Sequence, residues 1–138
     1  MKLTHPFIDE NGDKLREECG VFGVINATDA SAVAALGLHA LQHRGQEAAG
    51  ITSYNGDRFY SLRGTGHVAD NFSTEEALGE LPGNMAAGHV RYSTTGGSGL
   101  RNVQPLYADL ASGGFAVAHN GNISNARTLR DDLVSRGA

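Results

Sequence analysis

Apolar and polar positions alternate along the chain in short blocks that predict strands and helices. A run rich in Val, Ile and Phe predicts a buried strand over Gly20–Asn26. Thr28 and Asp29 are suitable N-cap residues, so we expect a helix over Ser31–His43. Gly45, just after it, is the expected C′ glycine that stops the helix. The residues expected on its buried stripe are Val33, Leu36, Ala40 and Leu41.

The middle of the chain carries two strong local signals. Asn55-Gly56 lies between apolar runs at Ala49–Tyr54 and Arg58–Leu62 and predicts a β-hairpin, because this dipeptide readily adopts the positive φ angles of a tight turn. Further on, Ser73-Thr74-Glu75-Glu76 has the pattern of a capping box. It predicts a short helix that ends before Pro82-Gly83.

The second half of the chain predicts two more strands and a last helix. The strands are expected over Met85–Tyr92 and, as part of the core, over Phe115–His119, with a mobile loop at Gly96–Gly99. Asn120-Gly121-Asn122 then turns the chain into a helix over Ser124–Ser135. Consecutive strands with interspersed helices favour an α+β fold or a layered sandwich over a strictly alternating parallel fold.

Composition narrows the class of protein. A length of 138 residues suits one domain, and 40% hydrophobic with 19% charged residues is typical of globular proteins. A net charge of −4 without a basic stripe argues against nucleic acid as a partner, and no apolar run is long enough to span a membrane. Residues 1–18 lack the apolar segment of a secretion signal, so the expected compartment is the cytoplasm.

Cys19 is the only cysteine of the chain and opens the apolar run that contains the first predicted strand. A lone thiol forms no internal disulfide, so it is either a buried bystander or a nucleophile. Cleavage after Glu18 would give Cys19 a free α-amine, which titrates at about 7.7–8.0 and can take the proton of the thiol. In the uncut chain this nitrogen is an amide without basicity. Residues 1–18 are therefore predicted to be a leader that keeps the precursor latent.

Three polar clusters follow predicted elements, in places where loops often carry function. They are His43–Glu47, His89–Thr94 and His119–Asn122. Arg91 either forms a structural ion pair or binds a ligand carboxylate through its planar guanidinium group. Asn120-Gly121 is either a simple turn or an oxyanion hole made of one side-chain amide and one unhindered backbone N–H.

Metal and phosphate sites are disfavoured by the same sequence. His39 and His43 share one helix face, but the glutamate that follows the first histidine in metalloprotease helices is missing. Gly96-Gly97-Ser98-Gly99 lacks the lysine of a phosphate-binding loop, and a hinged lid is the better interpretation. We therefore expect neither a metal nor a cofactor in this segment.

The motifs occur together in an order that resembles a known family. They are Glu18–Gly23, Gly37–Ile51, Gly88–Thr94 and His119–Asn122. In this combination they resemble the glutaminase domain of the glutamine phosphoribosylpyrophosphate amidotransferases, which are class II glutamine amidotransferases. The resemblance covers the chain from about Glu18 onward and implies an N-terminal-nucleophile hydrolase fold, a four-layer αββα sandwich that is partial here.

The resemblance also implies a role for each candidate residue. Cys19 would attack the side-chain amide of glutamine, and Asn120 and Gly121 would stabilise the oxyanion. Arg91 would hold the α-carboxylate of glutamine with help from Thr94. Arg44 matches a position near the nucleophile, and the stretch from Arg91 to about Asn102 matches a loop that closes over glutamine.

Further expectations concern the parent protein. The family passes ammonia to a second domain, where it converts phosphoribosylpyrophosphate to phosphoribosylamine in purine biosynthesis. The segments expected here are a propeptide over residues 1–18 and a truncated glutaminase domain over residues 19–138. Magnesium in the missing phosphoribosyltransferase domain, a possible 4Fe-4S cluster with ligands outside this chain, and a homo-oligomeric parent are also implied.

Two other interpretations remain open from the residues. Cys19 could pair with His89 or His119 as a conventional thiol–imidazole dyad, which would tolerate the leader. The chain could instead be a non-catalytic module that binds glutamine or regulates a partner, or a fragment that is inactive because it is unprocessed and truncated. A binding module would be indifferent to loss of the thiol.

Overall fold

The computed structural model describes residues 19–42, 46–92, 99–121 and 123–137. The predicted leader and Gly45 lie outside these ranges. Described elements in chain order are β1 (Gly20–Ile25), α1 (Ala30–Leu41), β2 (Ala48–Tyr54), β3 (Phe59–Thr65), α2 (Val68–Phe72), α3 (Glu75–Gly79), β4 (Met85–Arg91), the 3-10 turn η1 (Leu100–Asn102), β5 (Leu106–Leu110), β6 (Gly113–Val117) and α4 (Ala126–Ser135).

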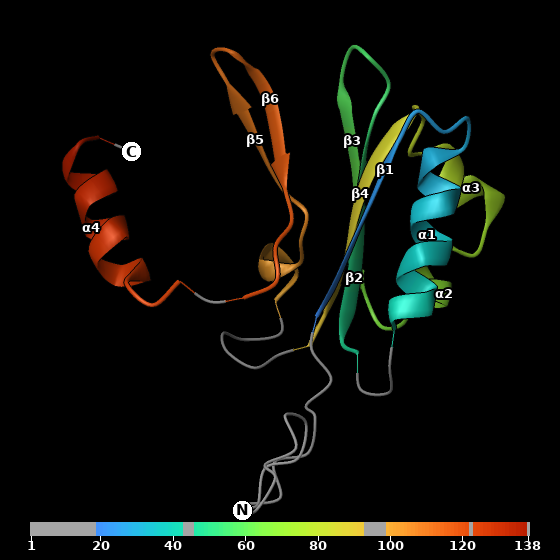
Figure 1. Cartoon of the computed structure of the whole chain (residues 1–138), viewed down its shortest axis with the longest axis horizontal. Coiled ribbons are helices and arrows are strands. Elements are labelled where there is room, and N and C mark those ends of the chain that lie inside the picture. Colours follow the sequence, from blue (N-terminus) through green and yellow to red (C-terminus); the bar gives the residue numbers. More distant parts are fainter. Residues whose placement is uncertain (1–18, 43–45, 93–98, 122, 138) are drawn as a thin grey trace, which may run out of the picture.

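The elements are arranged in layers around one antiparallel sheet. Its strand order is β1-β4-β2-β3, and β5 and β6 form a separate antiparallel pair. In Figure 1, helices α1, α2 and α3 lie on one side of the sheet, the β5–β6 hairpin lies on the other side, and α4 lies beyond the hairpin. This order of helix, sheet, sheet and helix confirms the predicted α+β class. It is the order of an αββα sandwich, with two strands described in its second sheet layer.

The close contact between α1 and the sheet depends on small residues. The apolar stripe predicted for this helix, which comprised Val33, Leu36, Ala40 and Leu41, is wrong. The buried residues of the helix are Ala30, Ser31, Ala34, Ala35 and Leu38, whereas Leu36 is 72% exposed. Leu38 lies over Gly88 of β4, and the ring of Phe22 lies over Gly37. A face of alanine and glycine lets the helix approach the sheet more closely than a face of larger side chains would. The helix ends at Leu41 with an extended Gln42, before the predicted glycine cap.

The β2–β3 hairpin confirms the prediction from Asn55-Gly56. The Oδ1 atom of Asn55 accepts hydrogen bonds from the backbone N–H groups of Asp57 and Arg58, both at 3.0 Å. Gly56 has a φ of +98°, a backbone angle that residues other than glycine rarely adopt. The local chemistry of the turn therefore determines where β2 ends and where β3 begins.

Other local predictions were met in part. Thr74 caps α3 by accepting from the Ala77 N–H at 3.2 Å, and this helix ends before Pro82 as expected. The strand expected over Phe115–His119 is β6, but it is not a core strand, since Phe115 is 53% exposed. Helix α2 and strand β5 were not predicted.

A short segment before β5 covers the second face of the sheet near β2 and β3. Val103 and Pro105 are buried there, and the Arg63 guanidinium donates to the Val103 carbonyl at 3.2 Å. A Cβ atom on Gly50 would lie 2.3 Å from the Gln104 carbonyl oxygen. Glycine at this strand position therefore allows two backbones to come together.

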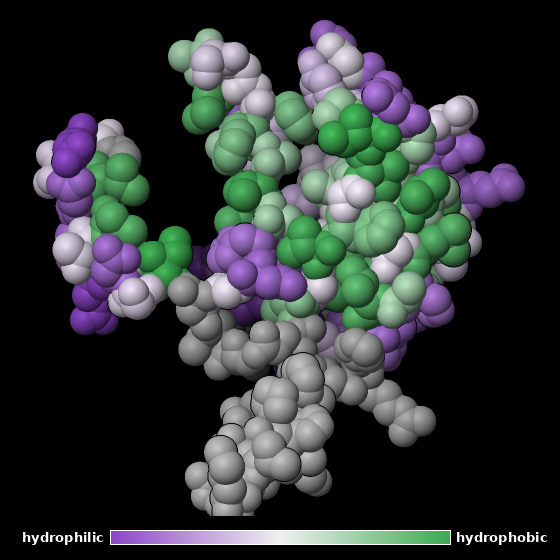
Figure 2. All heavy atoms as spheres, in the orientation of Figure 1, coloured by the Kyte–Doolittle hydropathy of each residue, from purple (hydrophilic) through white to green (hydrophobic). Residues whose placement is uncertain are grey.

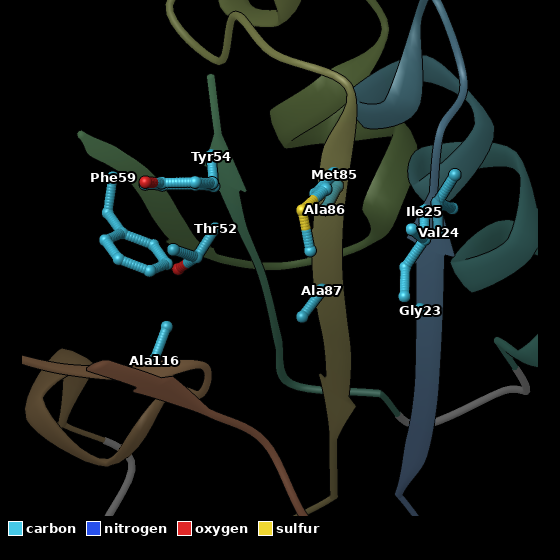
Figure 3. A pocket seen from close by; sticks show the side chains of 10 residues that line it. All are labelled: Gly23, Val24, Ile25, Thr52, Tyr54, Phe59, Met85, Ala86, Ala87 and Ala116. Carbon is cyan, nitrogen blue, oxygen red and sulfur yellow. The ribbon is translucent and has the colours of Figure 1, made fainter. Parts of the chain in front are cut away.

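The same face of the sheet is hollow at its other end. A cavity of about 440 Å³ lies between the sheet and Ala116 of β6, and Figure 3 shows Thr52, Tyr54 and Phe59 on one side of it and Met85 and Ala87 nearby. Its lining is apolar, and it lies at the end of β4 opposite to Arg91. It offers few groups that could recognise a polar substrate.

Helix α4 ends the described chain with an apolar side that is not buried. Leu129, Leu133 and Val134 are all exposed. Figure 2 shows the apolar residues of this helix mainly on the side toward the hairpin and polar residues on its outer side. Every helix in the described ranges is too short or too polar to cross a membrane.

We predict opposite effects for alanine at two strand glycines. Gly50→Ala should lower the free energy of unfolding by about 1–3 kcal/mol, because its methyl group would collide with the Gln104 backbone. Gly23→Ala is the matched control, since no atom lies within 4 Å of its Cβ position. It should be neutral or stabilise by up to about 1 kcal/mol. Urea unfolding of both variants tests the contact, and equal stabilities would contradict it.

Candidate active site

Three segments that are distant in sequence meet at Cys19. The half-buried thiol accepts a hydrogen bond from the Tyr92 N–H at 3.2 Å and lies 3.6 Å from the Tyr92 carbonyl, to which it donates. The Nδ2 group of Asn120 donates to the Cys19 carbonyl. These partners are 73 and 101 residues away along the chain. The structure thus brings together two of the predicted catalytic residues.

The sheet register explains this meeting. Gly20 pairs with Val90 in the ladder between β1 and β4, so Cys19 and Tyr92 both lie just beyond the paired ends of these strands. The Glu47 N–H donates to the Arg91 carbonyl at 3.0 Å and ties the end of β4 to the start of β2. The backbone beside the thiol is therefore held from both neighbouring strands.

Arg91 is the last residue of β4, and only 8% of it is exposed. Side chains alternate between the faces of a strand, so Arg91 and His89 lie on the same face, away from α1. Arg91 is also near enough to His89 to disfavour a second positive charge there. The predicted binding residue thus contributes its cation at the sheet end that carries Cys19.

Asn120 and Gly121 follow β6 in an exposed turn. Gly121 has a φ of +128°, and its Cβ position has open space around it. The backbone conformation therefore favours glycine here, and the open space leaves room for a small ligand beside this turn. The His119 N–H donates to the Gln104 Oε1 atom at 2.7 Å, which anchors this turn to the segment above Gly50.

His89 is a buried titratable group beside these residues. It is 1% exposed, and neither ring nitrogen makes a hydrogen bond of ordinary geometry. Burial and then the nearby charge of His119 lower the pKa of His89 from 6.5 to about 4, with a smaller contribution from Arg91. The ring is neutral at physiological pH and is not bonded to the Cys19 thiol, which disfavours the dyad that pairs this histidine with Cys19.

Sequence reasoning missed Gln104 and gave no role to Tyr92, although Tyr92 lies in the polar cluster His89–Thr94. Gln104 binds the backbone of His119 through its side chain, and Tyr92 binds the thiol through its main chain. Neither residue type is a usual mark of catalysis. The one available signal for Gln104 was indirect. Gly50 lies inside a predicted strand, and such glycines often mark a place where another backbone comes close, here the backbone of Gln104.

Some predicted site residues cannot be placed. Arg44, Thr94 and most of the expected glutamine loop lie outside the described residues. Within the described ranges, no three side chains of His, Cys, Asp or Glu gather in a way that could hold a metal ion.

Sequence comparison finds strong similarity to curated proteins. The chain is 54% identical over 141 residues to an amidophosphoribosyltransferase of Rhizobium etli, and this match covers 100% of the chain. It is 51% identical over 138 residues to the chloroplastic amidophosphoribosyltransferase of Vigna aconitifolia, with 99% of the chain covered. The chain spans about 28% of the length of each of these relatives. A scan against models of known protein families gives no match.

Comparison of folds agrees with this result. A solved structure described as the allosteric regulatory enzyme of purine biosynthesis matches with a TM-score of 0.78 and 43% identity. The glutamine phosphoribosylpyrophosphate amidotransferase of B. subtilis, in complex with ADP and GMP, matches with a TM-score of 0.75 and 41% identity. Each match covers 86% of this chain and 25% of the other.

The depressed pKa of His89 predicts a loss of stability in acid. Between pH 6.5 and about 4 the unfolded state binds a proton at this residue and the folded state does not, so stability falls as the pH is lowered. Across this window the contribution is about 3 kcal/mol. Urea unfolding of His89→Leu should show a shallower pH dependence than the original chain between pH 7 and 4.5. Identical slopes would contradict the buried, neutral ring.

Proposed function

Since this chain belongs to the amidophosphoribosyltransferase family, we propose that it is the glutaminase part of such an enzyme, which hydrolyses the side-chain amide of glutamine and supplies the ammonia. One observation carries the proposal. The Tyr92 backbone contacts the Cys19 thiol and the Asn120 carboxamide contacts the Cys19 carbonyl, although these partners are 73 and 101 residues away along the chain. A thiol with an adjacent amide donor is the arrangement that acyl transfer needs.

In the proposed reaction the sulfur of Cys19 attacks the side-chain carbonyl carbon of glutamine. Its proton passes to the α-amine of Cys19, which becomes available once residues 1–18 are removed. Asn120 Nδ2 and the Gly121 N–H stabilise the tetrahedral oxyanion. Collapse of this intermediate breaks the C–N bond, and the proton held by the α-amine leaves with ammonia. Water then hydrolyses the thioester, giving glutamate and the free thiol.

The remaining groups bind and activate the reactants. The Tyr92 N–H, 3.2 Å from the sulfur, donates a hydrogen bond that orients the thiol for attack. Arg91 binds the α-carboxylate of glutamine, for which its buried guanidinium provides a bidentate partner. Thr94 and Arg44 are assigned to substrate binding by resemblance.

The whole enzyme has a wider proposed role. Its second domain uses the ammonia to displace pyrophosphate from phosphoribosylpyrophosphate in the synthesis of purines. Magnesium in that domain, a 4Fe-4S cluster and a homo-oligomeric assembly are proposed for parts of the parent protein outside this chain. The cytoplasm is the proposed compartment, although a relative at 51% identity is chloroplastic by name.

The state of the Cys19 nitrogen tests the mechanism. We expect the active full-length protein to begin at Cys19, as measured by intact mass and N-terminal sequencing. Cys19→Ala should abolish release of glutamate from glutamine, because no other group attacks the amide. Active protein that still carries residues 1–18 would contradict the amine as base and favour a thiol–imidazole dyad. Full activity of Cys19→Ala would contradict the glutaminase itself.

A second prediction concerns the oxyanion. Asn120→Ala in the full-length protein should lower kcat for glutamine hydrolysis by about 100- to 1000-fold, the usual effect of removing one donor. KM should change much less, since the donor acts mainly on the transition state. Asn125→Ala is the matched control, because this exposed asparagine makes no side-chain capping bond at α4. Equal kcat values for the two variants would exclude the proposed role of Asn120.

A further inference from the structure

The turn that carries Asn120 and Gly121 lies beyond the end of its own hairpin. The ladder between β5 and β6 ends at Val117, so the pairing of these two strands does not extend to residues 118–121. His119, Asn120 and Gly121 are all exposed. An exposed segment of this kind has few packing contacts to define its position. Hydrogen bonds from neighbouring segments therefore decide where its donor groups point.

Two hydrogen bonds connect this turn to segments that are distant along the chain. On one side, the Asn120 Nδ2 group donates to the Cys19 carbonyl. On the other side, the His119 N–H donates to the Gln104 Oε1 atom at 2.7 Å, a short bond for this pair of atoms. The first bond uses the same carboxamide that must also serve the oxyanion. The second bond uses no reacting group, so it is available throughout the reaction.

The backbone of Gln104 is held against the central sheet. Its carbonyl oxygen lies so close to Gly50 of β2 that a Cβ atom there would be 2.3 Å away. The residues on either side, Val103 and Pro105, are buried, and the Arg63 guanidinium on β3 donates to the Val103 carbonyl at 3.2 Å. The side chain of Gln104 therefore extends from a backbone that is fixed to both β2 and β3.

The same sheet also fixes the nucleophile. Strand β2, which carries Gly50, pairs with β4, and β4 pairs with β1. The first residue of β1 is Gly20, which directly follows Cys19. A continuous series of backbone contacts thus joins the thiol to the support under Gln104. The Gln104 side chain extends this series to the turn that carries the oxyanion donors.

We infer that Gln104 is a positioning residue, whose Oε1 atom holds the His119 backbone and thereby aligns the oxyanion donors that follow it with the substrate amide. This inference rests on the proposed glutaminase function. A displacement of about 1 Å in a catalytic group can lower the rate by about 100-fold. The bond from His119 lies at the exposed surface, so water can replace the lost acceptor. Loss of Gln104 should therefore impair catalysis far more than stability.

The test compares two replacements of Gln104 in the full-length protein. Gln104→Leu removes the acceptor and keeps a side chain of similar size, whereas Gln104→Glu keeps an acceptor oxygen at the same place. We expect Gln104→Leu to lower kcat for glutamine hydrolysis by about 10- to 100-fold. KM for glutamine should change by less than about threefold, because Arg91 still binds the substrate. Gln104→Glu should keep kcat within about threefold of the original value.

A matched control separates positioning from a general loss of stability. Thr74→Ala also removes a side-chain oxygen that accepts a backbone N–H, but this bond lies at the start of α3, on the other side of the sheet in Figure 1. Thr74→Ala should leave kcat unchanged. The melting temperature should fall by less than about 8 °C in both Thr74→Ala and Gln104→Leu.

A double-mutant cycle tests whether Gln104 acts through the oxyanion turn. In the Asn120→Ala background, Gln104→Leu should lower kcat by a clearly smaller factor than in the original protein, because part of its route of action is already gone. Effects of the two substitutions that multiply would show that Gln104 acts by another route, and would overturn the inference.

The remaining outcomes discriminate between this inference and the function on which it rests. An original protein without glutaminase activity would refute the proposed function. An active original protein would refute only the positioning role if kcat is unchanged in Gln104→Leu, or is reduced equally in Gln104→Glu or in Thr74→Ala. Should Gln104→Leu fail to fold, Gln104→Asn takes its place with the same expected fall in kcat, because the shorter side chain withdraws the acceptor and remains polar.

Discussion

The pairing of β4 with strands on both of its sides is the constraint on which the rest of this structure depends. β4 pairs with β1 along one edge and with β2 along the other, so its register is determined twice. That register puts His89 and Arg91 on the face away from α1 and leaves the Tyr92 backbone beside Cys19. A shift by one residue would turn both side chains toward α1 and remove the site.

The two faces of the sheet serve different purposes. Toward α1, small residues such as Gly88 and Ala34 allow a helix to approach closely, and the core of the described chain lies there. The opposite face carries polar and charged groups at the end near Cys19 and an apolar hollow at the other end. The main apolar core lies on the first face. The second face also buries Val103 and Pro105, but it keeps an unpaired imidazole and a buried guanidinium, which a fold selected for stability alone would avoid.

Local sequence signals predicted the parts of the fold that short-range chemistry controls. Asn55 and Thr74 each satisfy nearby backbone N–H groups, so the hairpin and the start of α3 could be foreseen from a few residues. The buried face of α1 could not be foreseen in this way. Its apolar pattern offered Leu36 as readily as Leu38, and the presence of Gly88 opposite one of them decided the choice. Periodicity describes a helix surface but not the shape of the surface that meets it.

The sequence by itself determined the chemical groups of the site: one thiol that could become N-terminal, an Asn-Gly pair, and an arginine inside a strand. Its resemblance to a known family connected them before any geometry was available. Only the tertiary structure decided that the Asn120 carboxamide reaches Cys19, that Gln104 anchors the turn, and that His89 is neutral. These properties depend on distance and burial across pairs of segments up to 101 residues apart, and such quantities arise from packing rather than from any local pattern.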